Sequence, residues 1–600
     1  MKTRRWLAVP VMVAAVLMIW SSAVSAQVLQ QVPADALVVV KIRNLQDVST
    51  KASGLMEAMG VANLNPAMAD PLAGLQQQTG IANGLDKNGD IAIYVPASVL
   101  DDPDAEQKPA VILWPITDYK AFIGNFPDAQ TEGGVTTFKM GQNPNESYAA
   151  NWGKYAAVSQ MRDLVANKPA NLGLKPAGLA AKELDTKDIT AYFNVAPARE
   201  KLLPKLKESR PQVIAEMQAQ MGEDEAKKKY LPLATAVVNR ALDLAEQLLK
   251  ETNAATYGVN LTNEGINTTA LAEFDPKSQF GQRAAQIKGV NDPLLTGLPE
   301  SQYLVFGGSK FDSKVLSAVV EDLVGPIEDE LAKLGDEGKA VAAYIDALKK
   351  MMAAGDSSRF GMVAPTGQLG QESLFQMINI ATGDAKAMLE AQKQMFAVAD
   401  EFTALTGGGQ VQSKTTVTPD AKTVAGVELD QIQSVINAAG QGAEAQQIQQ
   451  MMSMMYGPNG ITAYTGIIDD KTLITVQGAG DELLEKAVTA AKANQDVLSK
   501  RAGVAAVKKQ LPQSRNMVLY VPVDTIITTG LTYAQQFGVP VQLQLPPDLP
   551  PLGFTGGAEG SAIRFDSHVP AQLVQSVVSA GMQAFMQMQG GRQPGGPGGL

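Results

Sequence analysis

The side chains able to act as nucleophiles or acid–base groups are few in type. The chain has no cysteine and a single histidine, His568. Without cysteine it can form no thiolate nucleophile, disulfide or Cys-based metal site, and any Ser-His-Asp mechanism would have to use His568. His568 follows Asp566 and Ser567 directly, and adjacent residues do not converge as a triad does. We therefore expect a surface or helix-capping histidine and predict no catalytic residue.

Two acidic segments resemble cation sites. Residues 86–90, Asp-Lys-Asn-Gly-Asp, begin like a calcium loop with side-chain oxygens at alternating positions. The motif then fails, because Ile91 replaces its sixth-position glycine and Ala97 its bidentate glutamate. We therefore predict a turn that leads into a strand at 91–95. The acidic segment 101–106 could hold a divalent cation weakly, but its composition favours a solvated loop, and we predict no metal site.

Two glycine-containing segments imitate nucleotide-binding loops. Gly478-Ala479-Gly480 follows a strand-like run and precedes a helix, but Leu483 takes the place of the third glycine of the dinucleotide motif. The preceding strand also belongs to a predicted hairpin rather than to a parallel βαβ unit. Residues 335–340 lack the spacing and the hydroxyl of a phosphate-binding loop. The sequence thus predicts no cofactor.

The methionines near residue 450 allow two interpretations. Met451, Met452, Met454 and Met455 could bind copper(I) through their thioethers. Ile448, Met451, Met452, Met455 and Tyr456, however, recur at intervals of three and four residues. That spacing favours a helix whose apolar stripe packs on a core or forms an adaptable binding face.

Charge composition narrows the classes of partner. The 61 acidic side chains outnumber 50 basic ones, and the isoelectric point is near 5.0. An acidic chain opposes binding to nucleic acid or to an anionic membrane surface. The carboxylates leave open a hydrolase that uses an acid pair, but convergence is a three-dimensional property and the sequence nominates no pair.

Residues 1–26 have the pattern of a secretory signal peptide. Lys2, Arg4 and Arg5 precede an apolar run at 6–20, and the small residues 24–26 end in Ala26. The run is shorter than the roughly 20 residues of a spanning helix. We predict cleavage after Ala26 and location in the periplasm or outside the cell. Removing three of the 50 basic residues leaves 47 against 61 acidic ones, a net charge of −14.

A short phrase recurs along the chain. Leu-Pro or Val-Pro, a few small or polar residues and then an apolar strand-like run occur at 32–42, 298–306 and 511–521, and a version without proline occurs at 184–195. Proline cannot donate to a central ladder, so it suits the entry to a strand. A second phrase places one or two strands before an aspartate and a helix, at Asp275, Asp384, Asp481 and Asp566. We expect these aspartates to cap the helices.

The phrases follow nearly the same order in 27–295 and 296–589, which predicts an α+β fold: a tandem duplication of antiparallel sheet units covered by helices. In the predicted correspondence, the strands at 91–94, 111–114, 148–159 and 189–195 match those at 360–363, 375–380, 464–476 and 517–521. Long helical insertions at 212–250 and 315–352 are divided at Pro232 and Gly335. The glycine- and proline-rich end, 590–600, is a predicted disordered tail.

The entry phrase at Val32–Val40, with its recurrences at Leu298 and Leu511, resembles a group of uncharacterised bacterial exported proteins. In that group a Val/Leu-Pro-Ala-Asp-Ala phrase and an apolar strand follow the signal peptide. The resemblance covers most of the chain after residue 26. It implies export and architecture, and it carries no catalytic or binding residue.

Together these features favour a non-catalytic binding or structural protein of the periplasm or cell envelope, acting on a protein or envelope component. Two alternatives stay open: an extracytoplasmic hydrolase that uses carboxylates, and a carrier of an apolar ligand. Close acids in a polar cleft would favour the hydrolase, and a continuous apolar cavity would favour the carrier.

Overall fold

The structure is a computed structural model, and it describes residues 27–62, 69–101, 109–141, 145–222, 228–365, 367, 370, 373–406, 411–438, 442–536, 538, 543 and 545–590. The chain is an α+β protein of antiparallel sheets and covering helices, as predicted. The predicted signal peptide, 1–26, and nearly all of the predicted tail lie outside the described residues. Two compact units are distinguished. Unit 1 takes its described residues from Met1–Glu208, Ala245–Ala285 and Glu559–Val578, and unit 2 from Ser209–Leu244, Gln286–Ala558 and Ser579–Leu600.

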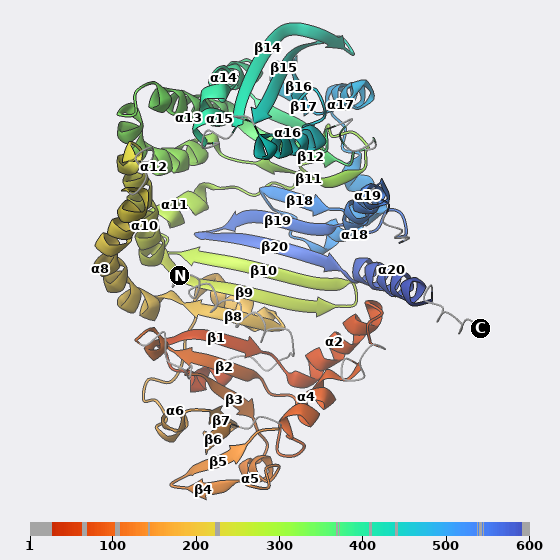
Figure 1. Ribbon diagram of the computed structural model, residues 1–600. Helices are drawn as coiled ribbons and strands as arrows, with labels where there is room; N and C mark the ends of the chain where they lie inside the picture. The colour runs from red at the N-terminus through yellow and green to blue at the C-terminus, as the bar shows by residue number, and fades with distance from the viewer. Residues whose placement is uncertain are drawn as a thin grey trace, which may run out of the picture. The chain divides into compact units, whose positions relative to one another are not determined.

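Unit 1 contains an antiparallel sheet in the order β4-β5-β6-β7-β3-β2-β1-β8-β9-β10-β20, which Figure 1 shows from β4 upwards. The strands are β1 (Ala36–Ile42), β2 (Ile91–Pro96), β3 (Val111–Pro115), β4 (Gln130–Glu132), β5 (Val135–Lys139), β6 (Glu146–Asn151), β7 (Tyr155–Ser159), β8 (Ile189–Asn194), β9 (Thr252–Thr262), β10 (Gly265–Phe274) and β20 (Ala562–Pro570). The last strand of the chain therefore completes the sheet of the first unit.

Helices cover both faces of this sheet around β1. Successive strand residues point to opposite faces, and Val39 and Val40 belong to different buried clusters. The Val39 cluster includes residues of α6 (Arg162–Ala166) and α7 (Gly178–Thr186), and the Val40 cluster includes residues of α2 (Leu45–Ala58), α4 (Pro71–Thr79) and α5 (Tyr119–Ile123).

Unit 2 contains an antiparallel sheet in the order β14-β15-β16-β17-β13-β12-β11-β18-β19. The strands are β11 (Tyr303–Lys310), β12 (Gly355–Val363), β13 (Gln376–Gly383), β14 (Val411–Val424), β15 (Val427–Ala438), β16 (Ile461–Asp469), β17 (Thr472–Gln477), β18 (Met517–Val521) and β19 (Leu552–Glu559). The long hairpin β14–β15 is visible at the top of Figure 1.

Two sets of helices lie on opposite faces of the unit 2 sheet. α17 (Asp481–Ala493) and α18 (Ala502–Gln510) pack on the main buried cluster, which includes Ile474 and Val476 of β17. The intervening residue Thr475 points the other way and accepts a hydrogen bond from Gln392 of α14 (Ala385–Ala397). The further helices of this unit are α12 (Ser313–Ala332), α13 (Asp336–Ala354), α15 (Ala399–Thr406), α16 (Ala443–Tyr456) and α19 (Val523–Gln536).

Nine strands follow the same order in both units, with each strand of unit 2 ten places after its counterpart. Every strand pair in the predicted correspondence occupies matching positions. The orders support the predicted duplication, which stays a prediction because strand order alone does not establish common descent. The compact units do not follow the predicted boundary at residue 295 throughout. Residues 209–244, from the predicted first half, belong to unit 2, and residues 559–578, from the predicted second half, belong to unit 1.

The insertions are helical, as predicted. α12 ends at Ala332 and α13 begins at Asp336, either side of Gly335. Pro232 lies in the first turn of α10 (Leu231–Glu251), where a missing backbone N–H costs little. The helix before it, α8 (Val195–Gly222), begins earlier than the expected 212. α11 (Gln279–Gln286) follows the β9–β10 hairpin.

The expectation that four aspartates cap helices was correct for Asp384 alone. Asp384 accepts a hydrogen bond from the backbone N–H of Ala387 at 3.1 Å. Asp275 stabilises a turn four residues before α11, and Asp481 is the first residue of α17 rather than its cap. Asp566 lies inside β20, because that strand runs on to Pro570.

Candidate functional site

His568 is a buried strand residue, which corrects the expected surface or capping position. It lies in β20, is 2% exposed, and its Nδ1 donates to Oδ1 of Asn267 on β10 at 2.8 Å. Burial lowers the pKa of His568 to about 4, although the charge of Glu264 acts in the opposite direction. The imidazole ring is therefore neutral near pH 7, and its hydrogen bond to Asn267 links the neighbouring strands β20 and β10.

The carboxylates that do converge in unit 1 are bound to cations. Arg564 on β20 makes a bidentate ion pair with Asp566 at 2.8 and 2.9 Å, and its Nη1 lies 3.0 Å from Oε1 of Glu183 on α7. Thr269 donates to Asp566 at 2.6 Å and accepts from Lys187 at 2.8 Å. Burial opposes the charge of Arg564, but the hydrogen bonds and charge of Asp566, with Glu183 and Glu559, raise its pKa. The charges of this network pair with one another, although Oε2 of Glu183 accepts no hydrogen bond.

The segment that resembles a calcium loop is a turn, as predicted. Oδ1 of Asp86 accepts from the backbone N–H of Asn88 at 3.0 Å, and β2 follows at Ile91. Asp90 is buried, accepts from the backbone N–H of Asn44 and lies 3.5 Å from the ammonium of Lys41. In the second acidic segment Asp101 pairs with Lys201, and residues 102–106 lie outside the described residues.

The two glycine segments connect secondary-structure elements, and the methionines near residue 450 lie on a helix. β17, which precedes Gly478, pairs antiparallel with β13 and β16, so the predicted hairpin is confirmed. Gly335 connects two helices. Met451 is 48% exposed on α16 and Met454 is 36% exposed, so Met451 does not pack on a core. The alternative for this helical stripe, an adaptable binding face, stays a prediction.

One hollow in the described part of unit 2 lies beside α17. Leu484, Ala487, Val488 and Ala491 bury one face of this helix in the core. The helical repeat places Glu482, Lys486, Thr489 and Ala493 on an outer face, and these residues line the hollow. Acidic residues in the first turn of α17 favour the helix through its dipole, and Asn494 ends it in the left-handed conformation.

The opposite wall is the strand-entry phrase at 298–301, held by three contacts. The buried Tyr303 hydroxyl donates to the carbonyl of Pro299 at 2.7 Å. Arg501 donates to the carbonyl of Ser301 at 3.3 Å, and the backbone N–H of Gly297 donates to the carbonyl of Gln495 at 3.0 Å. The wall is therefore held by hydrogen bonds within the chain.

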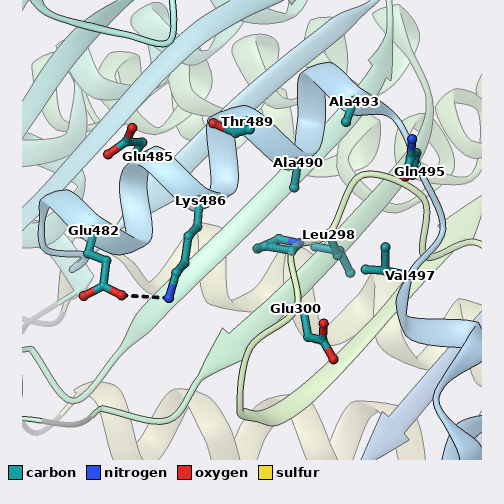
Figure 2. A pocket seen from close by; sticks show the side chains of 11 residues that line it. Leu298, Glu300, Glu482, Glu485, Lys486, Thr489, Ala490, Ala493, Gln495 and Val497 are labelled. Carbon is teal, nitrogen blue, oxygen red and sulfur yellow. Dashed lines mark hydrogen bonds and ion pairs between the residues drawn. The ribbon is translucent and has the colours of Figure 1, made fainter.

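This hollow, the α17 pocket, has a volume of about 530 Å³ and a mixed lining (Figure 2). Glu482 and Lys486 form an exposed ion pair of 2.7 Å, and this hydrogen bond lowers the pKa of Glu482. In Figure 2 the carboxylates of Glu300 and Glu485 do not point toward one another. The pocket can contact a partner through both apolar and charged groups.

The sequence predicted the entry phrase and the helix α17 as structural elements, but it did not predict that they line the same pocket. The polar outer face of α17 was the available signal, because Glu482, Lys486 and Thr489 recur at helical spacing. What could not be foreseen was that residues 298–300 lie about 190 positions away in sequence and form the facing wall.

The described residues contain no membrane-spanning helix: none of their helices is both long and apolar enough to cross a bilayer. Within the same residues, no group of three or more His, Asp or Glu side chains is placed to hold a metal ion.

Comparisons with known proteins identify no family. Neither the family models nor the curated proteins include a match to this chain. Solved structures of TP0453 are similar to it in part. Crystal form III has 12% identity over 48% of this chain and 98% of that chain, with a TM-score of 0.18. Crystal form IV has 12% identity over 50% and 99%, with a TM-score of 0.19. At these scores the similarity carries no argument about fold or function.

Proposed function

We propose that this chain is an exported protein of the periplasm or cell envelope that binds a protein or envelope component without transforming it. The export half of the proposal rests on the pattern of residues 1–26. The binding half rests on one observation: charged groups that meet closely, such as Arg564 with Glu183 and Asp566, neutralise each other, while the α17 pocket faces solvent beside a wall held by hydrogen bonds.

Site-specific photo-cross-linking in intact cells tests the binding half. A photoreactive residue replaces Thr489 in the α17 pocket, and a matched control replaces Lys386, an exposed residue of α14 on the other face of the unit 2 sheet. We expect one discrete adduct from position 489 and none from position 386. Equal adducts from both positions, or none from either, would contradict binding at this pocket.

Fractionation and N-terminal sequencing test the export half. We expect the chain in the periplasmic or envelope fraction with Gln27 as its first residue. Recovery of the uncleaved chain in the cytoplasm would contradict export, whatever the result of cross-linking.

A carboxylate hydrolase is the second candidate, because Glu300, Glu482 and Glu485 line the same pocket. The purified chain and its Glu300→Gln and Glu485→Gln variants are incubated with isolated envelope polymers. New cleavage products from the wild type that either variant abolishes would replace the binding proposal with the hydrolase. The mixed lining of the pocket gives the apolar carrier no corresponding support.

A further inference from the structure

A second hollow lies on the α17 face of the unit 2 sheet, where β12 and β13 meet the end of α17. Its volume is about 280 Å³, and we call it the Arg359 cavity. Ala491 and Asn494 of α17 form one side. Arg359 on β12 stands directly opposite Ile380 on β13, which in turn faces Ile474 on β17. Directly opposed residues share a face, so Arg359 lies on the side that α17 covers.

Arg359 has unused hydrogen-bonding capacity. Its Nε is buried and has no hydrogen-bond partner, and its guanidinium forms no ion pair with any described residue. Burial lowers the pKa of Arg359, against the charges of Asp292 and Asp356, but an arginine keeps its proton. A buried donor without a partner is unfavourable. No contact among the described residues already neutralises the guanidinium, so a carboxylate that enters the cavity would meet this charge at its lining. The neighbouring Lys471 adds a second cation at the rim.

Two carboxylates reach the same cavity because two strands contain irregularities. Asp356 is the extra residue of a β-bulge in β12, and a bulge at Ile468 in β16 shifts Asp469. Bulges re-aim side chains that regular alternation would place elsewhere. Asp356 accepts from the Thr382 hydroxyl at 2.5 Å, and Asp469 accepts from the backbone N–H of Lys471 at 2.9 Å. Each carboxylate has two oxygens and keeps further acceptor capacity.

The lining therefore combines two cations, Arg359 and Lys471, with two anions, Asp356 and Asp469. A purely anionic ligand would be repelled by the aspartates, and a purely cationic one by the arginine and lysine. A ligand that carries both charges complements both. At roughly 30 Å³ for each water-sized group, the cavity holds about nine such groups, which matches a small organic molecule.

We infer that the Arg359 cavity binds a free small zwitterion of the α-amino acid type, with its carboxylate on Arg359 and its ammonium between Asp356 and Asp469. The inference goes beyond the proposed partner binding and uses none of the residues of the α17 pocket wall at 298–300. Cross-linking at Thr489 and ligand binding at Arg359 can consequently succeed or fail independently.

Titration calorimetry of the purified chain from residue 27 tests the ligand class with three matched probes. L-Alanine carries both charged groups, propionate lacks the ammonium, and ethylamine lacks the carboxylate. We expect saturable binding of L-alanine and at least about tenfold weaker binding of the other two, since each has lost one charge-assisted contact. Propionate binding as tightly as L-alanine, or no binding of L-alanine, would overturn the inference.

Substitutions test which residue binds the carboxylate of the ligand and which binds its ammonium group. Arg359→Gln and Asp356→Asn should each weaken L-alanine binding at least about tenfold, and Arg359→Lys, which keeps the charge but loses the planar fork, should have an intermediate effect. Arg162→Gln and Asp128→Asn make the same charge changes at exposed positions of unit 1 and should leave the affinity unchanged.

A melting curve of each variant shows whether it is folded, so that a lost fold is not mistaken for a lost contact. If Arg359→Gln unfolds, the decision passes to Arg359→Lys and Asp356→Asn. Full affinity in these two folded variants would overturn the inference.

Discussion

Each unit has a buried cationic side chain two residues before a strand, and the two strands, β8 and β18, hold matching positions in their sheets. The two side chains differ in their hydrogen-bond and ion-pair partners. In unit 1, Lys187 precedes β8 by two residues, donates to Thr269 at 2.8 Å and lies 3.5 Å from the carboxylate of Glu183. In unit 2, Arg515 precedes β18 by two residues and is 2% exposed. Its Nη1 donates to two backbone carbonyls, while Nε and Nη2 have no partner.

The difference shows that two sheets with the same strand order need not pair their buried cations with carboxylates in the same way. Unit 1 supplies carboxylates from α7 and β20, and these saturate Lys187 and Arg564. Unit 2 leaves donors of Arg359 and Arg515 without partners, whereas in unit 1 the Nε of Arg43 is a buried donor without one. We therefore expect Lys187 and Arg564 in unit 1 to contribute more to the free energy of unfolding than Arg359 and Arg515 in unit 2.

The largest effect is expected from Asp90→Asn. Asp90 and Lys41 have fully buried side chains. Burial already lowers the pKa of Lys41, and the charges of Asp90 and, more weakly, Asp185 oppose that shift, so the variant removes the main charge that compensates the buried ammonium. Breaking one side of a buried pair costs about 3–5 kcal/mol. Hydrogen exchange of the β1 amides measures the loss. Asp47→Asn, which removes a half-exposed partner of Lys51, should cost less than about 1 kcal/mol, and equal losses would refute this reasoning.

Arg564→Met and Arg515→Met compare the units directly. Removing Arg564 leaves Asp566 and Glu183 with less compensation, and we expect a loss of about 2–4 kcal/mol, below the Asp90 effect because the Arg564 side chain is 20% exposed. Removing Arg515 sacrifices bonds to two carbonyls and relieves two unpaired donors, for a loss of about 1 kcal/mol. Denaturant unfolding followed by hydrogen exchange separates the units. A larger loss for Arg515→Met would reverse the comparison.

His568 predicts a pH dependence confined to unit 1. Its folded pKa, about 4, lies below the ordinary 6.5, so the unfolded chain binds more protons between these values. Stability therefore falls as the pH drops from about 6.5 to about 4 and flattens below, by about 3 kcal/mol in total. Stability of wild type and His568→Gln is measured across this range. Since carboxylates titrate in both proteins, the difference between their curves isolates the histidine, and parallel curves would exclude its contribution.

The smallest effect is expected from Arg359→Gln in the absence of ligand. Its Nε has no hydrogen-bond partner to lose, so the free energy of unfolding should change by less than about 1 kcal/mol. Thermal melting of the unliganded variant measures this. A loss as large as that of Asp90→Asn would mean that the guanidinium already has a partner within the chain.

The sequence predicted those parts of the fold that local patterns encode. The hairpin at 257–274, the helix break at Gly335 and the strands at 91–95 and 517–521 all occur, because turn residues and apolar periodicity specify them. The pattern around Asp566 misled, because a polar run that resembled a helix cap was a strand whose Asp566 and His568 are buried against β10.

The polar cavities could not be predicted for a related reason. Asp356 and Asp469 reach the Arg359 cavity through register shifts, and a one-residue shift turns a side chain to the opposite face of a sheet. The partner of Arg564 on α7, Glu183, is 381 positions away in sequence. Contacts of that separation leave no periodic signal in a single chain.

The place of β20 in the sheet of unit 1 sets an order of events during biosynthesis. β10 pairs with β20 along Gly265 to Glu273, yet nearly 300 residues are made between the two strands. Until β20 has been synthesised, β10 presents an unsatisfied edge of the kind that recruits foreign strands. The sheet of unit 1 therefore cannot be completed before residues 562–570 have been synthesised.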